Sequence, residues 1–355
     1  MDKFANRPET ERREILQEAA TRRGVSTSIM EKDFWVCWTL KRLFEDAELA
    51  PHLIFKGGTS LSKCYGLIER FSEDIDLTIS RQAPYLSDGK NPGEDEISGK
   101  ERERRIDALK KNAQAFVEKV ILPKLKDRIG HVLGKTDAWN VVLDDEDPDR
   151  QTILFHYPKV FSYKIGTNFH NFTFDHSNFS ERDGYILPRL KLEFGARGET
   201  EPSEARPIRS YVAETFPDIV VEDVGSIPTL AVKRTFWEKA TILHSLYHGS
   251  KMRDRMSRHY YDTYMMDTKK VATSALHDVA LLDQVVHNKS LLFRDAKASY
   301  ETAKIGSLRL VPNNALLSSL QRDYATMNEM FMSEAPAFDA IMSGLAELEK
   351  RINKP

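Results

Sequence analysis

The sequence contains only two cysteines among its 355 residues, Cys37 and Cys64. Two thiols supply neither a disulfide framework nor a cysteine zinc cage, which fits a reducing cytoplasm. Long apolar runs are also missing: no window approaches the ~18 uninterrupted apolar residues of a membrane span. The first residues contain no apolar signal core. We therefore expect a cytoplasmic protein with no membrane partner.

The sequence also lacks a large excess of charge of either sign. Its formal net charge is −2, so no overall basic field predicts nucleic-acid binding, which would need a local basic patch. Charged residues make up 30% of the chain and hydrophobic residues 41%, as in ordinary soluble globular proteins. The length allows one large or two medium domains with a real core.

The pattern of the chain changes near residue 225. Before that point, strand-like runs at 51–56, 75–79, 139–143, 152–157 and 186–194 alternate with helical patterns. One of these helices, over 101–122, is expected to end at Pro123, and Arg81–Lys100 is expected to be a loop that could be mobile. After residue 225 nearly all patterns are helical. We predict an α+β fold, with a mixed sheet and flanking helices in 1–225 and a helical domain in 226–355.

The strongest chemical signal lies in the stretch Leu53–Ile79. A short apolar strand leads into Gly57-Gly58, which would let the backbone approach a phosphate closely. The hydroxyls of Thr59 and Ser60 follow, at the start of a short helix. The N-terminus of that helix would offer N–H donors and the positive end of its dipole. We interpret this turn as a phosphate-binding element, to which the nearby Lys56 and Lys63 add donors.

Two aspartates, Asp74 and Asp76, follow inside an alternating strand pattern. Residues two apart on a strand point their side chains in one direction, so the two carboxylates would repel each other. A divalent cation removes that repulsion, and Mg²⁺ prefers one or two carboxylates, waters and phosphate oxygens. The stretch therefore predicts a site for a nucleoside triphosphate with Mg²⁺, or with Mn²⁺ as the alternative ion, arranged for in-line displacement at phosphorus.

At this point the sequence resembles a known family. KGGTSLSKCYGLIERFSEDIDLTI looks like the first motif of the polymerase-β-like nucleotidyltransferase superfamily. More closely, it is similar to the AbiEii/AbiGii toxin family, which includes the MenT-type toxins. MEKDFWV at Met30–Val36 resembles the N-terminal helix signature of that family, and FWEKATILH at Phe236–His244 and RHYYD at Arg258–Asp262 resemble its downstream motifs. The resemblance spans about residues 10 to 350.

The resemblance implies a nucleotidyltransferase-type sheet and a role for each matching residue. Asp74 and Asp76 would bind the metal, Lys239 would contact nucleotide phosphate, and Asp262 would be an essential acid. Gly58 and Ser60 would lie at the triphosphate turn. The full set of nucleotide-binding residues that we predict is Lys56, Gly57, Gly58, Thr59, Ser60, Lys63, Arg70 and Arg258.

Two of the candidate acids have an ordinary structural alternative. Polymerase-β-like enzymes commonly use a third carboxylate, and Glu193 would approach the metals if its strand lies beside Ile75–Ile79. The alternative for Glu193 is a surface ion pair with a Lys or Arg. Asp262 lies four residues after Arg258 on a helix, so a purely structural Arg258–Asp262 pair is the alternative there.

The resemblance implies a toxin-type nucleotidyltransferase (EC 2.7.7 type). It would use Mg²⁺ and an NTP to transfer a nucleoside monophosphate to an acceptor, a tRNA 3′ end, with release of pyrophosphate. It would be a type IV toxin–antitoxin or phage-defence component, whose adjacent-encoded antitoxin need not bind it. The basic, aromatic stretch Lys251–Tyr264 is the best local candidate for an RNA surface, and a helix connector is the alternative.

Two other functions remain open from the sequence. One is transfer of the nucleoside monophosphate to a protein hydroxyl, as in AMP-adding relatives. The other is a catalytically inactive nucleotide-binding module that acts through partner contacts. The intact pair of Asp74 and Asp76 argues against the inactive module, because such a module needs no metal ligands.

Overall fold

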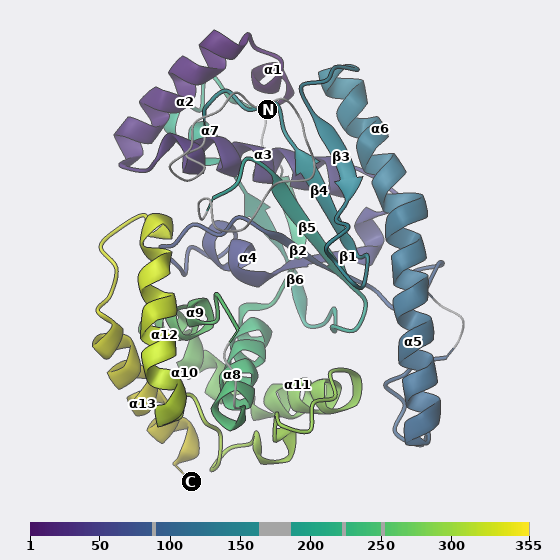
Figure 1. Ribbon diagram of the computed structural model, residues 1–355, viewed down its shortest axis with the longest axis vertical. Coiled ribbons are helices and arrows are strands. Elements are labelled where there is room, and N and C mark those ends of the chain that lie inside the picture. Colours follow the sequence, from purple (N-terminus) through teal and green to yellow (C-terminus); the bar gives the residue numbers. More distant parts are fainter. Residues whose placement is uncertain (87–89, 163–185, 222–224, 250–252, 355) are drawn as a thin grey trace.

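The computed structural model describes residues 1–86, 90–162, 186–221, 225–249 and 253–354 (Figure 1). A mixed sheet with flanking helices occupies one half of the molecule, and a group of helices occupies the other. The strands are β1 (Leu53–Lys56), β2 (Ile75–Ile79), β3 (Asn140–Leu143), β4 (Thr152–His156), β5 (Leu190–Gly195), β6 (Ser203–Ile208) and β7 (Gly225–Leu230).

The helices of the first half flank this sheet. They are α1 (Asp2–Ala5), α2 (Glu9–Arg23), α3 (Thr27–Phe44), α4 (Gly57–Lys63), α5 (Gly99–Phe116), α6 (Leu122–Leu133) and α7 (Tyr211–Thr215). Pro123 does not end a helix as predicted. It lies in the first turn of α6, where its missing N–H costs no hydrogen bond, and a π-helical segment at Val117–Ile121 joins α5 to α6.

The second half consists of α8 (Val232–His248), α9 (Ser257–Thr268), α10 (Val271–Leu276), α11 (Val279–Leu292), α12 (Asn314–Thr326) and α13 (Phe338–Asn353). The change from sheet to helices falls between Leu230 and Val232, because β7 still belongs to the sheet. None of the helices in the described part of the chain is both long and apolar enough to cross a membrane.

The described strands follow the order β3-β4-β5-β2-β1-β7-β6. Strand β2 lies between β1, to which it is antiparallel, and β5, to which it is parallel. The predicted neighbourhood of the strands that carry Asp76 and Glu193 is therefore confirmed. Alternation along β5 buries Leu190, Leu192 and Phe194 on one face and leaves the other face partly open. The open face is the one on which polar side chains gather.

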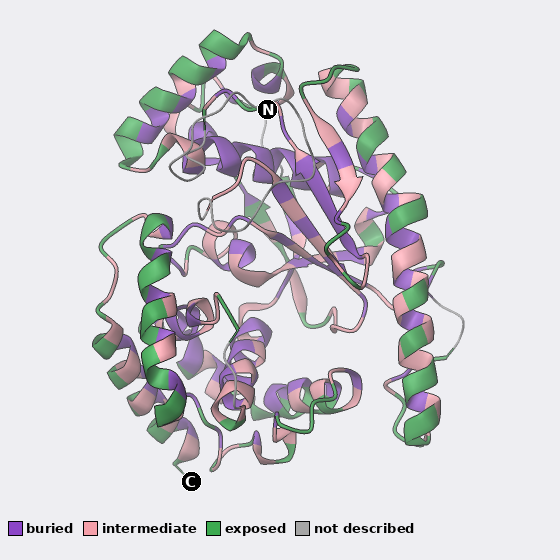
Figure 2. Cartoon of the chain, viewed as in Figure 1, coloured by how far each residue is buried: buried purple, intermediate pink, exposed green. Residues whose placement is uncertain are grey.

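Helix α3 lies against the apolar face of the sheet. Trp35 and Trp38 have their ring centres 6.0 and 6.1 Å from that of Phe155 on β4. Most of α3 is buried, as the purple ribbon of Figure 2 shows. The buried residues include three consecutive charged ones, Glu31, Lys32 and Asp33. This helix is the main support of the sheet half.

The two halves have separate hydrophobic cores joined at helix α4. Leu61 of α4 and Ile68 just after it pack into the core of the helical half, whereas Phe55 of β1 belongs to the core of the sheet half. The connector after α4 also runs beside residues 330–332, where Phe71 N donates to Met330 O at 2.7 Å. The glycine turn therefore lies where the halves meet (Figure 1).

The segment that we expected to be a loop, Arg81–Lys100, has no regular structure before α5 begins at Gly99. Its described parts are packed, since Ala83 and Leu86 are buried. Residues 87–89 of this segment lie outside the described residues.

Candidate active site

The diglycine turn is fixed by two close side-chain approaches. Gly57 has φ of +79°, a conformation that favours glycine, and a Cβ atom there would overlap the Asp76 carboxylate. A Cβ atom at Gly58 would lie 2.6 Å from Ser72 Oγ and 2.8 Å from Arg70 Nη2. The first glycine therefore makes room for Asp76, and the second makes room for Arg70. The predicted helix begins at Gly57 rather than at Thr59.

The hydroxyls of the turn are used within the protein. Thr59 Oγ1 donates to Asp74 O at 2.5 Å, and Ser60 Oγ donates to Gly57 O at 2.9 Å. Both side chains are buried. They hold the turn against the start of β2 and are not presented to a ligand as we predicted.

A row of polar side chains crosses the open face of the sheet. Lys56 on β1 pairs in register with Asp76 on β2, Asp76 pairs with Glu193 on β5, and Glu193 pairs with Thr152 on β4. Residues directly opposite on neighbouring strands project from the same face. Lys56, Asp76 and Glu193, predicted from separate segments, are therefore brought together.

The carboxylates of this row are short of positive charge. Burial, the largest cause, and the negative charges of Glu193 and Asp74 together raise the pKa of Asp76 to about 7, against the opposing effect of Lys56. Glu193 also makes an ion pair of 3.2 Å with Lys191. Glu193 therefore lies beside Asp76 and pairs with a lysine of its own strand, and its approach to a metal ion stays a prediction.

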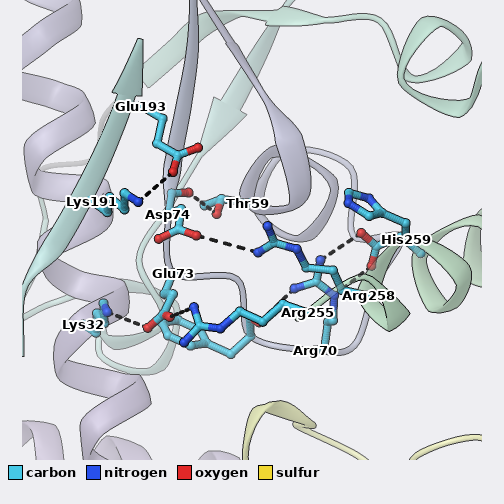
Figure 3. A network of polar contacts seen from close by, with 12 residues as sticks. Lys32, Thr59, Arg70, Glu73, Asp74, Lys191, Glu193, Arg255, Arg258 and His259 are labelled. Atoms are coloured by element: carbon cyan, nitrogen blue, oxygen red, sulfur yellow. Dashed lines mark hydrogen bonds and ion pairs between the residues drawn. The ribbon is translucent and has the colours of Figure 1, made fainter. Parts of the chain in front are cut away.

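Asp74 lies just before β2 and faces the helical half. Its carboxylate is 3.8 Å from the guanidinium of Arg258 on α9, and both side chains are partly exposed (Figure 3). The nucleotide-contacting role predicted for Arg258 fits this position at the mouth of the site. The alternative pairing of Arg258 with Asp262 is not observed in the described structure.

Asp262 instead belongs to a buried cluster with Arg70 and Lys239. Arg70 Nε and Nη2 donate to the two carboxylate oxygens at 2.8 Å each, and Lys239 Nζ lies 2.8 Å from Oδ2. Burial raises the pKa of Asp262, but the charges of Arg70 and Lys239 outweigh burial and leave the pKa well below its usual value. The carboxylate is fully buried and holds both cations, and its catalytic role stays a prediction.

Two predicted nucleotide contacts are placed elsewhere by the structure. The Lys63 ammonium forms a 2.7 Å ion pair with Asp33 and lies 3.5 Å from the centre of the Tyr211 ring, both well buried. The Arg70 guanidinium is fully engaged by Asp262 and by Phe71 O. Each cation therefore has a buried partner that the local pattern does not reveal, and direct phosphate contact stays a prediction for both.

Lys239 is buried in the same cluster. Its ammonium has three N–H donors, of which one is directed to Asp262 and another faces His259 Nδ1 at 3.4 Å. Burial lowers the pKa of Lys239, while Asp262 opposes that effect. Its contact with a nucleotide phosphate stays a prediction.

The sequence did not identify the braces behind the site. On α3, Lys32 forms a 2.6 Å ion pair with Glu73, next to Asp74 (Figure 3). Asp33 on the same helix forms a 2.7 Å ion pair with Lys63 on α4. Three consecutive charges within an otherwise apolar helix, Glu31, Lys32 and Asp33, were the available signal. Each is buried with a partner: Lys32 and Asp33 hold the connector and α4, and Glu31 accepts a hydrogen bond from Val160 N.

A cleft of about 440 Å³ adjoins the Glu193 end of the row. Lys56, Glu193 and Thr152 lie on its floor, and Phe293, after α11, reaches it from the helical half. The acidic turn at 144–149, between β3 and β4, forms one side. The cleft therefore continues the polar row toward the helical half.

Three carboxylates near the turn, those of Asp74, Asp76 and Glu193, are the candidate donors for a metal ion. Within the residues that the structure describes, no three His, Cys, Asp or Glu side chains are already arranged to hold a metal ion. Asp74 is turned toward Arg258 and Glu193 toward Lys191. The oxygen donors and the unbalanced negative charge nevertheless suit a hard divalent cation, and rotation of these two side chains would complete the set.

The mixed sheet thus carries a diglycine turn, Asp74 just before β2, and Asp76 in register with Glu193. Residues 38–344 match the family described as "Nucleotidyl transferase AbiEii toxin, Type IV TA system". Because the match covers most of the chain, the protein belongs to the AbiEii nucleotidyltransferase toxin family of type IV toxin–antitoxin systems, as the sequence motifs indicated.

The chain is also similar to MenT4, a nucleotidyltransferase toxin from Mycobacterium tuberculosis. The TM-score is 0.40 at 14% sequence identity, over 95% of this chain and 98% of that one. At this level the likeness adds no argument about function. No curated protein matches the sequence significantly.

Proposed function

We propose that the protein transfers a nucleoside monophosphate from an NTP to a hydroxyl at the 3′ end of tRNA, in the cytoplasm. The acceptor oxygen attacks the α-phosphorus and forms a new P–O bond. The bond between the α-phosphorus and the bridging oxygen breaks, and pyrophosphate leaves. The acceptor loses its hydroxyl proton, and no oxidant or reductant is needed.

The observation that carries this proposal is the in-register row of Lys56, Asp76 and Glu193 against the diglycine turn. The N–H groups that begin α4 and the cations Lys239 and Arg258 are placed to bind and orient the phosphates. A carboxylate oxygen of the row that is not bound to the ion can accept the proton of the acceptor hydroxyl. Arg70 and Asp262 hold Lys239 in position.

Asp74, Asp76 and Glu193 would hold Mg²⁺, with Mn²⁺ as the alternative. When bound, the ion would neutralise the carboxylates and polarise the phosphate oxygens. The residues around it would do the rest: Lys56 balances Asp76, and Thr59 fixes the backbone of Asp74.

The choice of tRNA rests on the family and on one surface. Of the stretch Lys251–Tyr264, Lys251 and Met252 lie outside the described residues. Arg253 is exposed and Arg258 is partly exposed, so both can reach a phosphate backbone. Tyr260 is buried and cannot stack on a base as we suggested. The antitoxin, encoded beside the toxin, would act on its effect without necessarily binding it, and phage defence would be the biological setting.

The test uses purified protein, Mg²⁺, tRNA and protein extract with each NTP, labelled in turn at the α- or the γ-phosphate. We expect α-label in tRNA and none from γ-label, because the β- and γ-phosphates leave together. Label in protein alone would favour the AMP-adding alternative.

The matched variants are Asp74→Ala, which should lose transfer, and Asp283→Ala, at an exposed carboxylate of α11, which should keep it. No label with any NTP from the wild type would support an inactive module and overturn the proposal.

A further inference from the structure

The cleft beside Glu193 differs in charge from the turn where the phosphates would lie. Five of its lining residues carry carboxylates: Asp144, Glu146, Asp147, Asp149 and Glu193. Only three are cationic: Lys56, Lys191 and Arg197. A triphosphate would be repelled here, whereas Arg70, Lys239 and Arg258 lie outside the cleft, at Asp262 and Asp74. The cleft therefore suits an uncharged part of a ligand.

One wall of the cleft is a planar cation stacked on an aromatic ring. Arg197 Cζ lies 4.6 Å from the centre of the Phe293 ring. The guanidinium is held by Leu292 O, at 3.5 Å from Nη1, and by Asp149, at 3.8 Å from Nη2. The Arg197 side chain is 31% exposed. One face of the guanidinium is thus occupied by Phe293 while part of the side chain remains accessible.

The cleft also has the size and the acceptors that a nucleoside needs. Small-molecule sites commonly measure roughly 300–1,000 Å³, and this cleft is about 440 Å³. Guanidinium planes and aromatic rings stack on bases, since every base presents a π-face. The carboxylates can accept hydrogen bonds from the amino groups of adenine, cytosine and guanine, which uracil lacks.

We propose that this cleft is a nucleoside-binding subsite, in which a base stacks on Arg197 over Phe293 and its sugar lies toward Glu193. The inference rests on the proposed function and adds to it the residues that recognise the base. The base belongs either to the incoming NTP or to the 3′-terminal nucleotide of the acceptor. In either case its phosphate points along the row toward the diglycine turn.

The experiment compares ligands with and without a nucleoside. The probes are the four α,β-methylene NTP analogues and inorganic tripolyphosphate, each with Mg²⁺, titrated calorimetrically into the full chain. The KM for tRNA is measured with saturating NTP. The variants are Arg197→Ala, Arg197→Lys, which keeps the charge beside Asp149 but not the plane, and Phe293→Ala.

We expect Arg197→Ala to weaken one nucleoside-dependent step about tenfold, the effect of losing one stacking partner. An increase in the Kd of the NTP analogues places the NTP base in the cleft, and an increase in the KM for tRNA places the acceptor base there. Tripolyphosphate binding should not change. Arg197→Lys and Phe293→Ala should behave like Arg197→Ala, and Arg322→Ala, at an exposed arginine of α12, should behave like wild type.

The inference is overturned if these variants leave both the Kd of every analogue and the KM for tRNA unchanged while transfer continues. It is equally overturned if tripolyphosphate and the analogues weaken alike, because the effect would then be one of charge. Failure of the proposed function looks different: the wild type would bind no analogue and transfer no label, and both conclusions would fall.

Discussion

Two groups of charged side chains lie on opposite sides of the diglycine turn, and they differ in how far their charges are balanced. In the buried cluster, Asp262 is paired with Arg70 and Lys239, and its pKa is lowered. In the carboxylate row, Asp76 faces Glu193 with too little positive charge nearby, and its pKa is raised to about 7. The paired cluster stabilises the fold, and the unpaired row is where a cationic ligand would be stabilised.

The largest effect is expected from a substitution that breaks the paired cluster. Asp262→Asn leaves Arg70 and Lys239 buried without a counter-charge, which should lower the free energy of unfolding by about 3–5 kcal/mol. Urea unfolding followed by circular dichroism measures this loss. Asp267→Asn, whose carboxylate pairs with Arg351 nearer the surface, is the control and should cost well under half as much. Equal losses in the two variants would contradict the distinction between cluster and surface.

An aspartate-to-asparagine substitution in the carboxylate row should affect catalysis rather than stability. Asp76→Asn should lower the rate of nucleotidyl transfer by about 100- to 1,000-fold, because the centre of the row loses its charge. Its free energy of unfolding at neutral pH should not fall, since the variant removes a repelled carboxylate. Transfer rates under saturating NTP and urea unfolding of the same preparations measure the two effects. A variant that is inactive because it is unfolded would not support the account.

Gly57 in the turn and Gly66 after it have similar backbone conformations and allow a sharper comparison. Gly57 has φ of +79° and contacts Asp76, whereas Gly66 has φ of +60° and nothing within 4 Å of an added Cβ. Gly66→Ala should cost only backbone strain, about 1 kcal/mol. Gly57→Ala should cost more and should also displace the Asp76 carboxylate, which lowers transfer. Thermal unfolding and transfer rates check both. Equal behaviour would mean that the approach of Asp76 to the turn is unimportant.

The last expected effect is a pH dependence of stability. The pKa of Asp76 in the folded chain, about 7, is above the 3.8 of an ordinary aspartate, so folding favours its neutral form. Wild type should therefore lose stability relative to Asp76→Asn as pH rises from about 4 to about 7, and should lose no more above that pH. Melting curves of both proteins in EDTA, with Asp283→Asn as the control, measure the difference. A difference that does not change with pH would contradict the raised pKa.

The sequence was sufficient to predict the row of polar side chains on the sheet, and insufficient to predict which buried ion pairs support the turn beside it. Strand alternation predicted which face carries Asp76 and Glu193, because a period of two is a local property. The partners of Lys63 and Arg70 lie in distant segments, on α3 and α9, so no local spacing could show that these cations are already paired. Strands β6 and β7 were missed because Pro207 and Pro228 interrupt their patterns.

The most direct test of the account is whether a divalent cation stabilises the protein through the carboxylate row. Melting temperatures are measured at pH 8 with increasing Mg²⁺, in parallel for wild type, Asp76→Asn and Asp283→Asn. We expect a clear rise for wild type and Asp283→Asn, about 2.7 kcal/mol of added stability at 100 times the Kd, and little for Asp76→Asn. No rise for wild type, or the same rise in all three, would contradict the claim that the unpaired row is a cation site.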